Sequence, residues 1–309
     1  TNRGDFMIHI IALNPSIDYL MSASSIDLGK TNRSNFEKIR IGGKGINVAI
    51  VLNNLGIDTT LHGFLGGFTG EHIRENLKEY PRINDKFINS NVLTRINVKI
   101  KTDIETELNG SGEIIDSRYI EQLEREIMTF TENDIVVMSG SISRGMNYSW
   151  YTKIAKHLHS KNIDFIVDIG SHELINILEY HPLLIKPNID EFLQITNVSD
   201  DYESILIAGK EMLKLGVKNI IISCGKDGSI YISNQELFKA TVPEGKLIDS
   251  VGAGDSMVAG FIAGIVKGES EKETYLLASA SGTATAFSEA LATSEEISAL
   301  MNKIKIERI

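Results

Sequence analysis

Short apolar runs alternate with stretches of helical periodicity over most of this chain. Runs rich in Ile, Val, Leu and Met predict buried strands at 7–13, 59–65, 135–139, 165–168, 183–185 and 219–223. Apolar residues at helical spacing predict helices at 46–55, 69–79, 117–130, 148–160, 172–178 and 202–215. Buried strands that alternate with helices predict an α/β domain, with a mostly parallel central sheet flanked by helices on both faces.

The C-terminal part of the chain departs from this alternation. A hairpin formed by 228–232 and 237–242 precedes a helix of apolar and small residues that begins near Ala253 or Gly254. We expect a further helix up to residue 290 and a last helix that closes the chain.

A second pattern predicts a small separate sheet. Residues 93–101 alternate between apolar and polar side chains, so Arg95, Asn97, Lys99 and Lys101 share one face of a strand. Residues 104–109 are suited to pair with that strand, and the polar-rich segment 15–40 lacks helical periodicity. We expect one domain over 7–309 with this sheet inserted from about 15–40 and 90–110, and we interpret residues 1–6 as a remnant foreign to the native chain.

The composition limits the kinds of partner. The 309 residues carry a formal net charge of −10, which argues against nonspecific binding to nucleic acid or to an acidic membrane. Cys224 is the only cysteine, which excludes an internal disulfide and a cysteine-rich zinc site and fits a reducing cytoplasm. No apolar run reaches the ~18 residues of a membrane span. Basic residues that gather in a pocket of this acidic chain would therefore indicate a local anion.

The glycine-rich motif Val251-Gly252-Ala253-Gly254-Asp255 leads directly into the predicted apolar helix. Backbone N–H groups at a helix N-terminus form a natural anion site. A carboxylate beside such a site serves poorly as a phosphate ligand but well as a general base, so we predict that Asp255 deprotonates an acceptor hydroxyl. The alternative is a plain glycine turn with Asp255 as the helix N-cap.

Polar residues follow the predicted strands at the points where the strands end. They are Asn14 and Asp18, Ser139 to Ser141, Asp168, Lys186 to Asn188, and Ser223 to Gly225. Because ligands of α/β sheets bind outside the carboxyl ends of the strands, this repeated bias predicts a binding site at that edge.

Two further glycine and capping motifs require interpretation. The run Gly42-Gly43-Lys44-Gly45 lacks the spacing of a P-loop, and no GxGxxG motif follows the first strand. Gly42 and Gly43 instead suggest a close approach of substrate to the backbone, with Asn47 one helical turn further on. Asn188 and Glu191 suit either a magnesium ion that keeps most of its waters or a capping box, and the sequence leaves both open.

Several motifs, in order, resemble the ribokinase-like sugar kinases of the phosphofructokinase B family. They are GGKGINVA at 42–49, KPNIDE at 186–191, SCGKDG at 223–228 and VGAGDSMVAGF at 251–261, and the match runs from Met7 over nearly the whole chain. The resemblance implies a ribokinase-like fold in which the small sheet is a lid over the substrate. It also implies an ATP- and Mg²⁺-dependent kinase that phosphorylates a sugar phosphate, and pairing of two subunits through their lid sheets.

The resemblance also implies residue roles. Asp255 would be the base, and Gly252, Ala253 and Gly254 the anion hole for the transferring phosphoryl group. Asp18, Gly42, Gly43, Lys44, Asn47 and Ser139 would bind the sugar. Lys30 and Arg95 would bind its phosphate, with Lys99 or Arg144 as an additional candidate. Lys186, Asn188, Ser223, Gly225 and Gly228 would bind ATP, and Glu191 would organise Mg²⁺ through water.

Within that family, the segments 14–18, 66–70, 94–101 and 281–292 most resemble the enzymes that act on fructose 1-phosphate. The implied product is fructose 1,6-bisphosphate. Tagatose 6-phosphate and fructose 6-phosphate are alternative acceptors. A sugar-phosphate sensor without catalytic activity is an alternative of another class, although Asp255 argues against it because a sensor needs no base.

Overall fold

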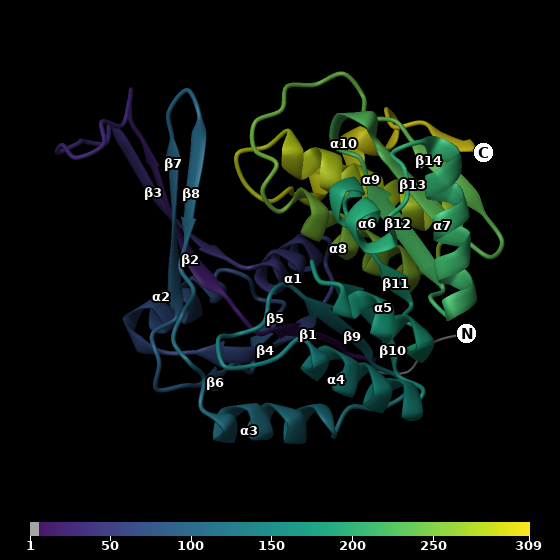
Figure 1. Ribbon diagram of the computed structural model, residues 1–309, viewed down its shortest axis with the longest axis horizontal. Coiled ribbons are helices and arrows are strands. Elements are labelled where there is room, and N and C mark those ends of the chain that lie inside the picture. The colour runs from purple at the N-terminus through teal and green to yellow at the C-terminus, as the bar shows by residue number, and fades with distance from the viewer. Residues whose placement is uncertain (1–5) are drawn as a thin grey trace.

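The computed structural model of this chain describes residues 6–309, with an eleven-stranded main sheet (Figure 1). Its strands are β1 (Ile8–Ala12), β4 (Thr59–Leu65), β5 (Ile83–Asp85), β6 (Ile88–Asn89), β9 (Ile135–Ser139), β10 (Asp164–Asp168), β11 (Leu184–Ile185), β12 (Asn219–Ser223), β13 (Ser229–Ser233), β14 (Leu237–Ala240) and β15 (Ile306–Arg308). The order is β15-β14-β13-β12-β11-β10-β9-β1-β4-β5, with β6 beside β4. Pairing is parallel from β12 to β5 and antiparallel from β12 to β15.

Helices cover both faces of this sheet, because successive side chains of a buried strand point to opposite sides. On β1, Ile8 and Ile10 belong to one core, and Ile11 belongs to the other. The first core is closed by α1 (Lys44–Asn54), α2 (Gly67–Leu77), α8 (Ala253–Lys267), α9 (Glu271–Ala286) and α10 (Ser294–Met301). The second is closed by α3 (Ser117–Ile127), α4 (Ser149–Ser160), α5 (Glu173–Ile177), α6 (Ile189–Thr196) and α7 (Tyr202–Leu215).

Four strands form a separate small sheet, the lid sheet, in the order β3-β2-β7-β8. They are β2 (Ser16–Ser22), β3 (Phe36–Gly42), β7 (Arg95–Lys101) and β8 (Glu105–Asn109). In Figure 1 the lid sheet stands upright at the left, opposite the helices of the C-terminal half. The predicted α/β fold with a small additional sheet from these two parts of the chain is confirmed.

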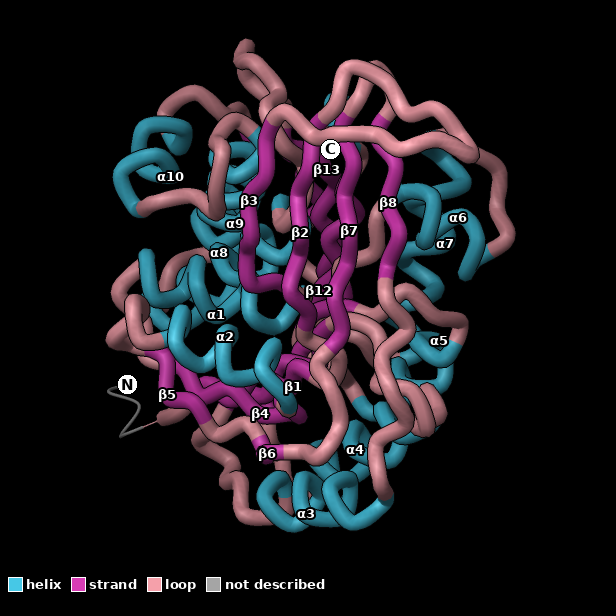
Figure 2. Tube along the Cα trace, turned by 90° about the vertical axis from the view of Figure 1, so that its left-hand side faces the viewer, coloured by secondary structure: helices cyan, strands magenta, loops and turns pink. Residues whose placement is uncertain are grey.

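The register of the lid sheet separates an inner polar face from an outer apolar face. Asp18 on β2 lies opposite Asn97 on β7 and Arg40 on β3, so these three side chains share the inner face. Side chains of the outer face include Ile39 and Leu108, which are both exposed. Figure 2 views the molecule from the side on which the lid sheet lies in front.

The structure differs from the sequence expectation mainly in its shortest elements. The chain does not close with a helix, because β15 follows α10 and pairs with β14 at the sheet edge. Strands β5 and β6 span three and two residues, too few to give a periodic signal. Within 6–309, no helix is both long and apolar enough to cross a membrane. The expected foreign remnant at 1–6 lies outside the described residues except for Phe6.

Candidate active site

A cavity of about 1410 Å³ lies between the inner face of the lid sheet and the carboxyl ends of the parallel strands. Most of the residues predicted for the site line it. They are Asp18, Gly43, Lys44, Asn47, Arg95, Lys99, Ser139, Lys186, Asn188, Glu191, Ser223, Gly225, Gly228 and the four residues from Gly252 to Asp255. The polar strand ends thus meet at one place, as the parallel sheet requires.

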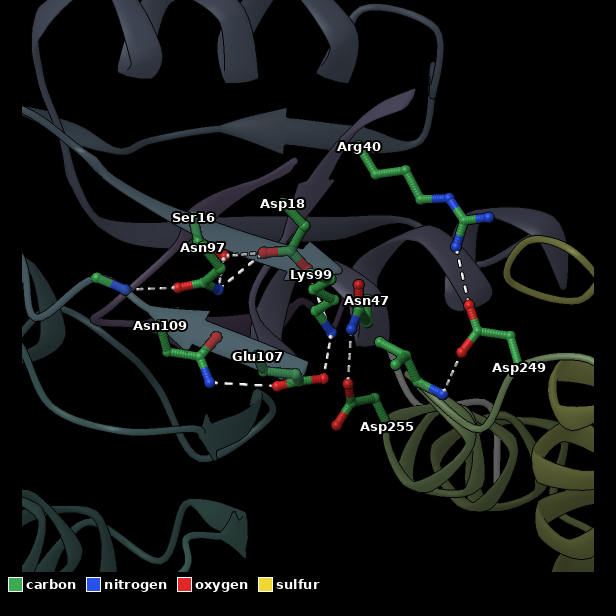
Figure 3. A network of polar contacts seen from close by, with 12 residues as sticks. Ser16, Asp18, Arg40, Asn47, Asn97, Lys99, Glu107, Asn109, Asp249 and Asp255 are labelled. Atoms are coloured by element: carbon green, nitrogen blue, oxygen red, sulfur yellow. Dashed lines mark hydrogen bonds and ion pairs between the residues drawn. The ribbon is translucent and has the colours of Figure 1, made fainter. Parts of the chain in front are cut away.

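The N-terminus of α8 forms the floor of this cavity. Gly252 is the N-cap residue with φ of 80°, a left-handed conformation that favours glycine. Asp255 lies in the first turn of α8, so the alternative that it caps the helix is wrong. The Asn47 side chain donates a hydrogen bond of 2.7 Å to Asp255 Oδ2, which orients the carboxylate from α1 (Figure 3).

The backbone donors at this N-terminus are not equivalent. The N–H of Ala253 donates to the Ser250 carbonyl at 3.2 Å. The N–H groups of Gly252 and Gly254 have no acceptor among residues 6–309. A Cβ on Gly254 would lie 2.9 Å from Lys186 Nζ, so glycine at this position lets the lysine approach the helix end. Two glycine N–H groups and one ammonium therefore lie at the helix turn that carries Asp255.

Asp168, at the end of β10, holds two lysines together. Lys44 Nζ lies 3.3 Å from both oxygens of Asp168, and Lys186 Nζ lies 3.6 Å from Oδ1. Asp168 is buried, and the two ammonium groups lower its pKa although burial opposes them. Proximity to Asp168 is also the main cause of the raised pKa of Lys44. We call Lys44 and Lys186 the lysine pair; its two positive charges suit the phosphates of a nucleotide.

The neighbouring carboxylate is perturbed in the opposite direction. Asp255 is 5% exposed, and its pKa is raised from 3.8 to about 6. Burial is the largest cause and the negative charge of Asp168 the next, while Lys44 and the hydrogen bond from Asn47 oppose them. A carboxylate with a pKa near 6 is ionised at neutral pH yet basic enough to accept a proton from a hydroxyl group.

A polar network covers the inner face of the lid sheet (Figure 3). Asp18 Oδ1 accepts hydrogen bonds of 2.8 Å from both Ser16 and Asn97. A Cβ on Gly42 would lie 2.7 Å from Asp18 Oδ2, so this glycine makes room for the carboxylate. Gly42 itself does not line the cavity, and its contact with substrate stays a prediction.

Glu107 is a cavity residue that the sequence analysis did not single out. It lies opposite Lys99 in the hairpin of β7 and β8, and its Oε1 is 3.2 Å from Lys99 Nζ. Lys99 Nζ also lies 3.9 Å from Asp18. The signal was present in the alternation of residues 104–109, whose polar positions face the same side as those of β7.

Arg95 is partly engaged within the protein. Its guanidinium donates to the carbonyl of Asn14 at 3.1 and 3.2 Å and to the carbonyl of Gly110 at 3.3 Å. Burial lowers the pKa of Arg95. The residue lines the cavity, so its role as a phosphate ligand stays a prediction.

The opposite end of the cavity contains the segments predicted for the nucleotide. Asn188 and Glu191 form a capping box at α6. The N–H of Glu191 donates to Asn188 Oδ1 at 2.8 Å, and the N–H of Asn188 donates to Glu191 Oε2 at 2.9 Å, as the capping alternative predicted. Ser223 ends β12, and Gly228 is constrained because a Cβ there would lie 1.9 Å from the Ala240 carbonyl oxygen.

These contacts leave a limited set of atoms for a metal ion. Only Oε2 of Glu191 is used in the cap, and Oε1 accepts no hydrogen bond from residues 6–309. Within that range, no group of three His, Cys, Asp or Glu side chains is arranged to hold a metal ion. Such a donor set fits Mg²⁺ that is bound mostly by phosphates and water, with one carboxylate nearby.

Two candidate phosphate ligands lie away from the cavity lining. Lys30 is in the exposed loop between β2 and β3, where its ammonium pairs with Asp27 at 3.2 Å. The loop lies beyond the ends of both strands, so Lys30 is outside the cavity lining, and its role as a phosphate ligand stays a prediction. Arg144 is also exposed.

Comparisons with known proteins agree with this geometry. Residues 11–297 match the profile of the pfkB family carbohydrate kinases. The 1-phosphofructokinase of Bacillus subtilis (strain 168) is 38% identical over 304 residues, covering 98% of this chain and 100% of that protein. A tagatose-6-phosphate kinase of Staphylococcus epidermidis is 33% identical over 282 residues, covering 89% and 91%.

A solved structure gives the same result for the fold. Phosphofructokinase-2 from Escherichia coli in complex with fructose-6-phosphate matches with a TM-score of 0.89 at 24% identity, covering 96% of this chain and 99% of that chain. At that identity the likeness concerns the fold alone, and the expected ribokinase-like architecture is confirmed.

Proposed function

The chain belongs to the pfkB family of carbohydrate kinases, which are ATP-dependent phosphotransferases, and we propose that its acceptor is D-fructose 1-phosphate. The product is then fructose 1,6-bisphosphate. The observation that carries the proposal is a buried carboxylate, Asp255, set beside free glycine N–H groups and facing basic side chains of the lid sheet.

Asp255 supplies the base. Its carboxylate takes the proton of the acceptor hydroxyl, and the hydroxyl oxygen forms a bond to the γ-phosphorus of ATP. As that bond forms, the bond from the γ-phosphorus to the oxygen that bridges it to the β-phosphorus breaks, and ADP leaves. Asn47 keeps Asp255 in place, because its hydrogen bond of 2.7 Å fixes one carboxylate oxygen.

The N-terminus of α8 and the lysine pair stabilise negative charge during the transfer. The N–H groups of Gly252 and Gly254 have no acceptor within residues 6–309, and Lys186 Nζ approaches the same helix end, so these groups can donate to the oxygens of the transferring phosphoryl group. Ala253 contributes less in this conformation, because its N–H is bonded to Ser250. Bound Mg²⁺ would neutralise phosphate charge, and Glu191 Oε1 is the atom suited to hold one of its waters.

The lid sheet selects a substrate that already carries a phosphate. Arg95 and Lys99 bring positive charge to the inner face of the lid, although the chain as a whole carries a net charge of −10. Asp18, held by Ser16 and Asn97, offers an acceptor for sugar hydroxyl groups. We propose fructose 1-phosphate as the acceptor in place of tagatose 6-phosphate because the B. subtilis 1-phosphofructokinase is more similar to this chain than the tagatose-6-phosphate kinase.

A coupled ADP-release assay tests the proposal. Fructose 1-phosphate, fructose 6-phosphate and tagatose 6-phosphate are offered in parallel with Mg-ATP and ranked by kcat/KM. We expect fructose 1-phosphate to rank first, and a higher rank for either other sugar would refute the acceptor. Arg95→Ala should raise the KM of the sugar phosphate far more than that of ATP. Equal increases in the KM of the sugar phosphate and the KM of ATP would show that Arg95 does not bind the sugar's phosphate.

We also propose that two subunits pair through the outer faces of their lid sheets. Ile39 is 49% exposed and Leu108 is 72% exposed, and both side chains lie on that face together with Ile96. An apolar face of this kind is costly to leave in water. An E. coli relative of the same fold is described in a tetrameric form, so assembly occurs among proteins with this architecture.

A further inference from the structure

Arg40 joins the lid sheet to the body of the protein. It lies on the edge strand β3, on the inner face and directly opposite Asp18. Its guanidinium donates to Asp249 Oδ2 at 3.0 Å (Figure 3). It also donates to the carbonyl oxygen of Glu289. The partners are 209 and 249 residues away in sequence, and both belong to the segments around α8 and α9.

The Arg40 side chain is partly buried at this contact. The side chains of Arg40 and Asp249 are 29% and 26% exposed. Arg40 Nε is buried and has no acceptor among residues 6–309. An arginine desolvated in this way is stabilised mainly by the bonds of its terminal nitrogens, so the contact depends on Asp249 and Glu289 staying in place.

Asp249 also holds the backbone turn that precedes α8. Its second carboxylate oxygen, Oδ1, accepts a hydrogen bond of 3.0 Å from the N–H of Val251, the residue before Gly252. The N–H groups of Ile248 and Asp249 both donate to the Ala286 carbonyl at the end of α9. One carboxylate thus links the lid to the turn from which the glycine N–H groups project.

We propose that Arg40 is a positioning residue, which sets the entry to the α8 N-terminus through Asp249 only while the lid is closed. When the lid opens, β3 withdraws the guanidinium, and Asp249 loses the partner that fixes the turn. The donors that stabilise the transferring phosphoryl group therefore keep their working geometry only while Arg40 stays on Asp249. The inference rests on the proposed function, because it assigns those donors to phosphoryl transfer.

A competing role for Arg40 makes different predictions. Arg40 shares the inner face with Asp18, so it could instead bind the phosphate of the sugar directly. In that case its loss would raise the KM of the sugar phosphate, and Asp249→Asn would have little effect or would free the guanidinium for substrate. If Arg40 acts through Asp249, both substitutions remove the same constraint and lower kcat.

The test compares Arg40→Gln, Asp249→Asn and the double variant, with the sugar phosphate that the unmodified enzyme uses best. We expect each single variant to lower kcat by about tenfold, because displaced donors lose part of the ~10²–10³ that one such donor contributes. The sugar-phosphate KM should change by less than about threefold, and the double variant should be no slower than the slower single variant. Arg40→Lys should restore part of kcat, since an ammonium can still pair with Asp249.

Lys38→Gln is the matched control, because Lys38 lies on the same strand and face but is exposed. It should retain the full kcat. A raised KM with unchanged kcat in Arg40→Gln, or multiplicative losses in the double variant, would overturn the proposal. Hydrogen–deuterium exchange of residues 247–254 gives a readout that needs no substrate. Faster exchange there in Arg40→Gln than in Lys38→Gln is expected, and equal exchange would also overturn the proposal, even if the enzyme accepted none of the sugars tested.

Discussion

Replacing Asp255 with Asn should make the enzyme nearly inactive and, at neutral pH, more stable. The base is lost, so turnover should fall by about 10²–10⁴-fold. The amide oxygen can still accept the hydrogen bond from Asn47, so the local geometry is preserved. Stability should increase because the native enzyme keeps a carboxylate ionised in a buried site, which is unfavourable for folding.

The size of this gain follows from the pKa of Asp255. Folding raises that pKa from 3.8 to about 6, and one pKa unit corresponds to about 1.36 kcal/mol. Because the folded-state pKa is the higher one, binding of a proton to Asp255 favours the folded state. This contribution to stability is fully present below pH 3.8 and is lost as the pH rises through about 6. At pH 7.5 the charged carboxylate therefore costs up to about 3 kcal/mol, and Asp255→Asn removes this cost but also the attraction to the lysine pair.

Urea denaturation at two pH values measures this contribution. The stability gain of Asp255→Asn should be larger at pH 7.5 than at pH 5 by about 1.4 kcal/mol, the part of the titration between these values. Asp103→Asn is the control, because it removes an exposed carboxylate in the turn between β7 and β8. It should change neither activity nor the pH dependence. A gain that is equal at both pH values, or a destabilised Asp255→Asn at pH 7.5, would refute a raised pKa for Asp255.

Three further predictions follow from other contacts. Burial lowers the pKa of both His9 and His62 to about 4, so native stability should fall by about 1.4 kcal/mol per histidine between pH 7.5 and 5.5. The urea midpoint of His62→Asn should therefore depend less on pH than that of the unmodified protein. An unchanged pH dependence would contradict the lowered pKa. Asp168→Asn removes a charge that raises the pKa of Asp255, so the acidic limb of the kcat/KM profile should move to lower pH. The KM of ATP should increase, because Asp168 no longer holds the lysine pair. An acidic limb that does not move would disprove the effect of Asp168 on the pKa of Asp255. Leu108→Glu should turn a lid-paired dimer into monomers in sedimentation velocity without reducing thermal stability, and a species of unchanged size would contradict pairing through that face.

The main architecture could be predicted from the sequence because its signals are local. Apolar runs at strand length and helical periodicity identified the parallel sheet, and the alternation around Arg95 identified a lid strand. The ends of parallel strands lie on one edge, so polar residues such as Asn14, Ser139 and Ser223 could be assigned to one cavity without knowledge of contacts. Short strands such as β15 were missed because three residues carry too little pattern.

Contacts between distant segments could not be predicted in this way. Asp168 could be assigned to the polar edge of the sheet, but only the fold shows that Lys44 and Lys186 both pair with it. Asn47 was expected to bind substrate, and in the structure its side chain holds Asp255. Arg40 lies at the end of the polar-rich segment 15–40, and only the fold brings Asp249 to it. The contacts of Asp168 with Lys44, of Asn47 with Asp255 and of Arg40 with Asp249 join residues more than a hundred positions apart, beyond the reach of periodicity and spacing.

The two buried carboxylates of the cavity illustrate how the fold separates their functions. Asp168 shares two ammonium groups, which keep its pKa low despite burial, so it is a poor proton acceptor at any physiological pH. Asp255 has one neutral donor, Asn47, and the charge of Asp168 adds to the effect of burial in raising its pKa to about 6. Carboxylates whose environments move their pKa values apart are suited to different roles. Asp168 is thus suited to hold the lysine pair, and Asp255 to accept the proton, and Asp168 improves Asp255 as a base while its own charge is balanced.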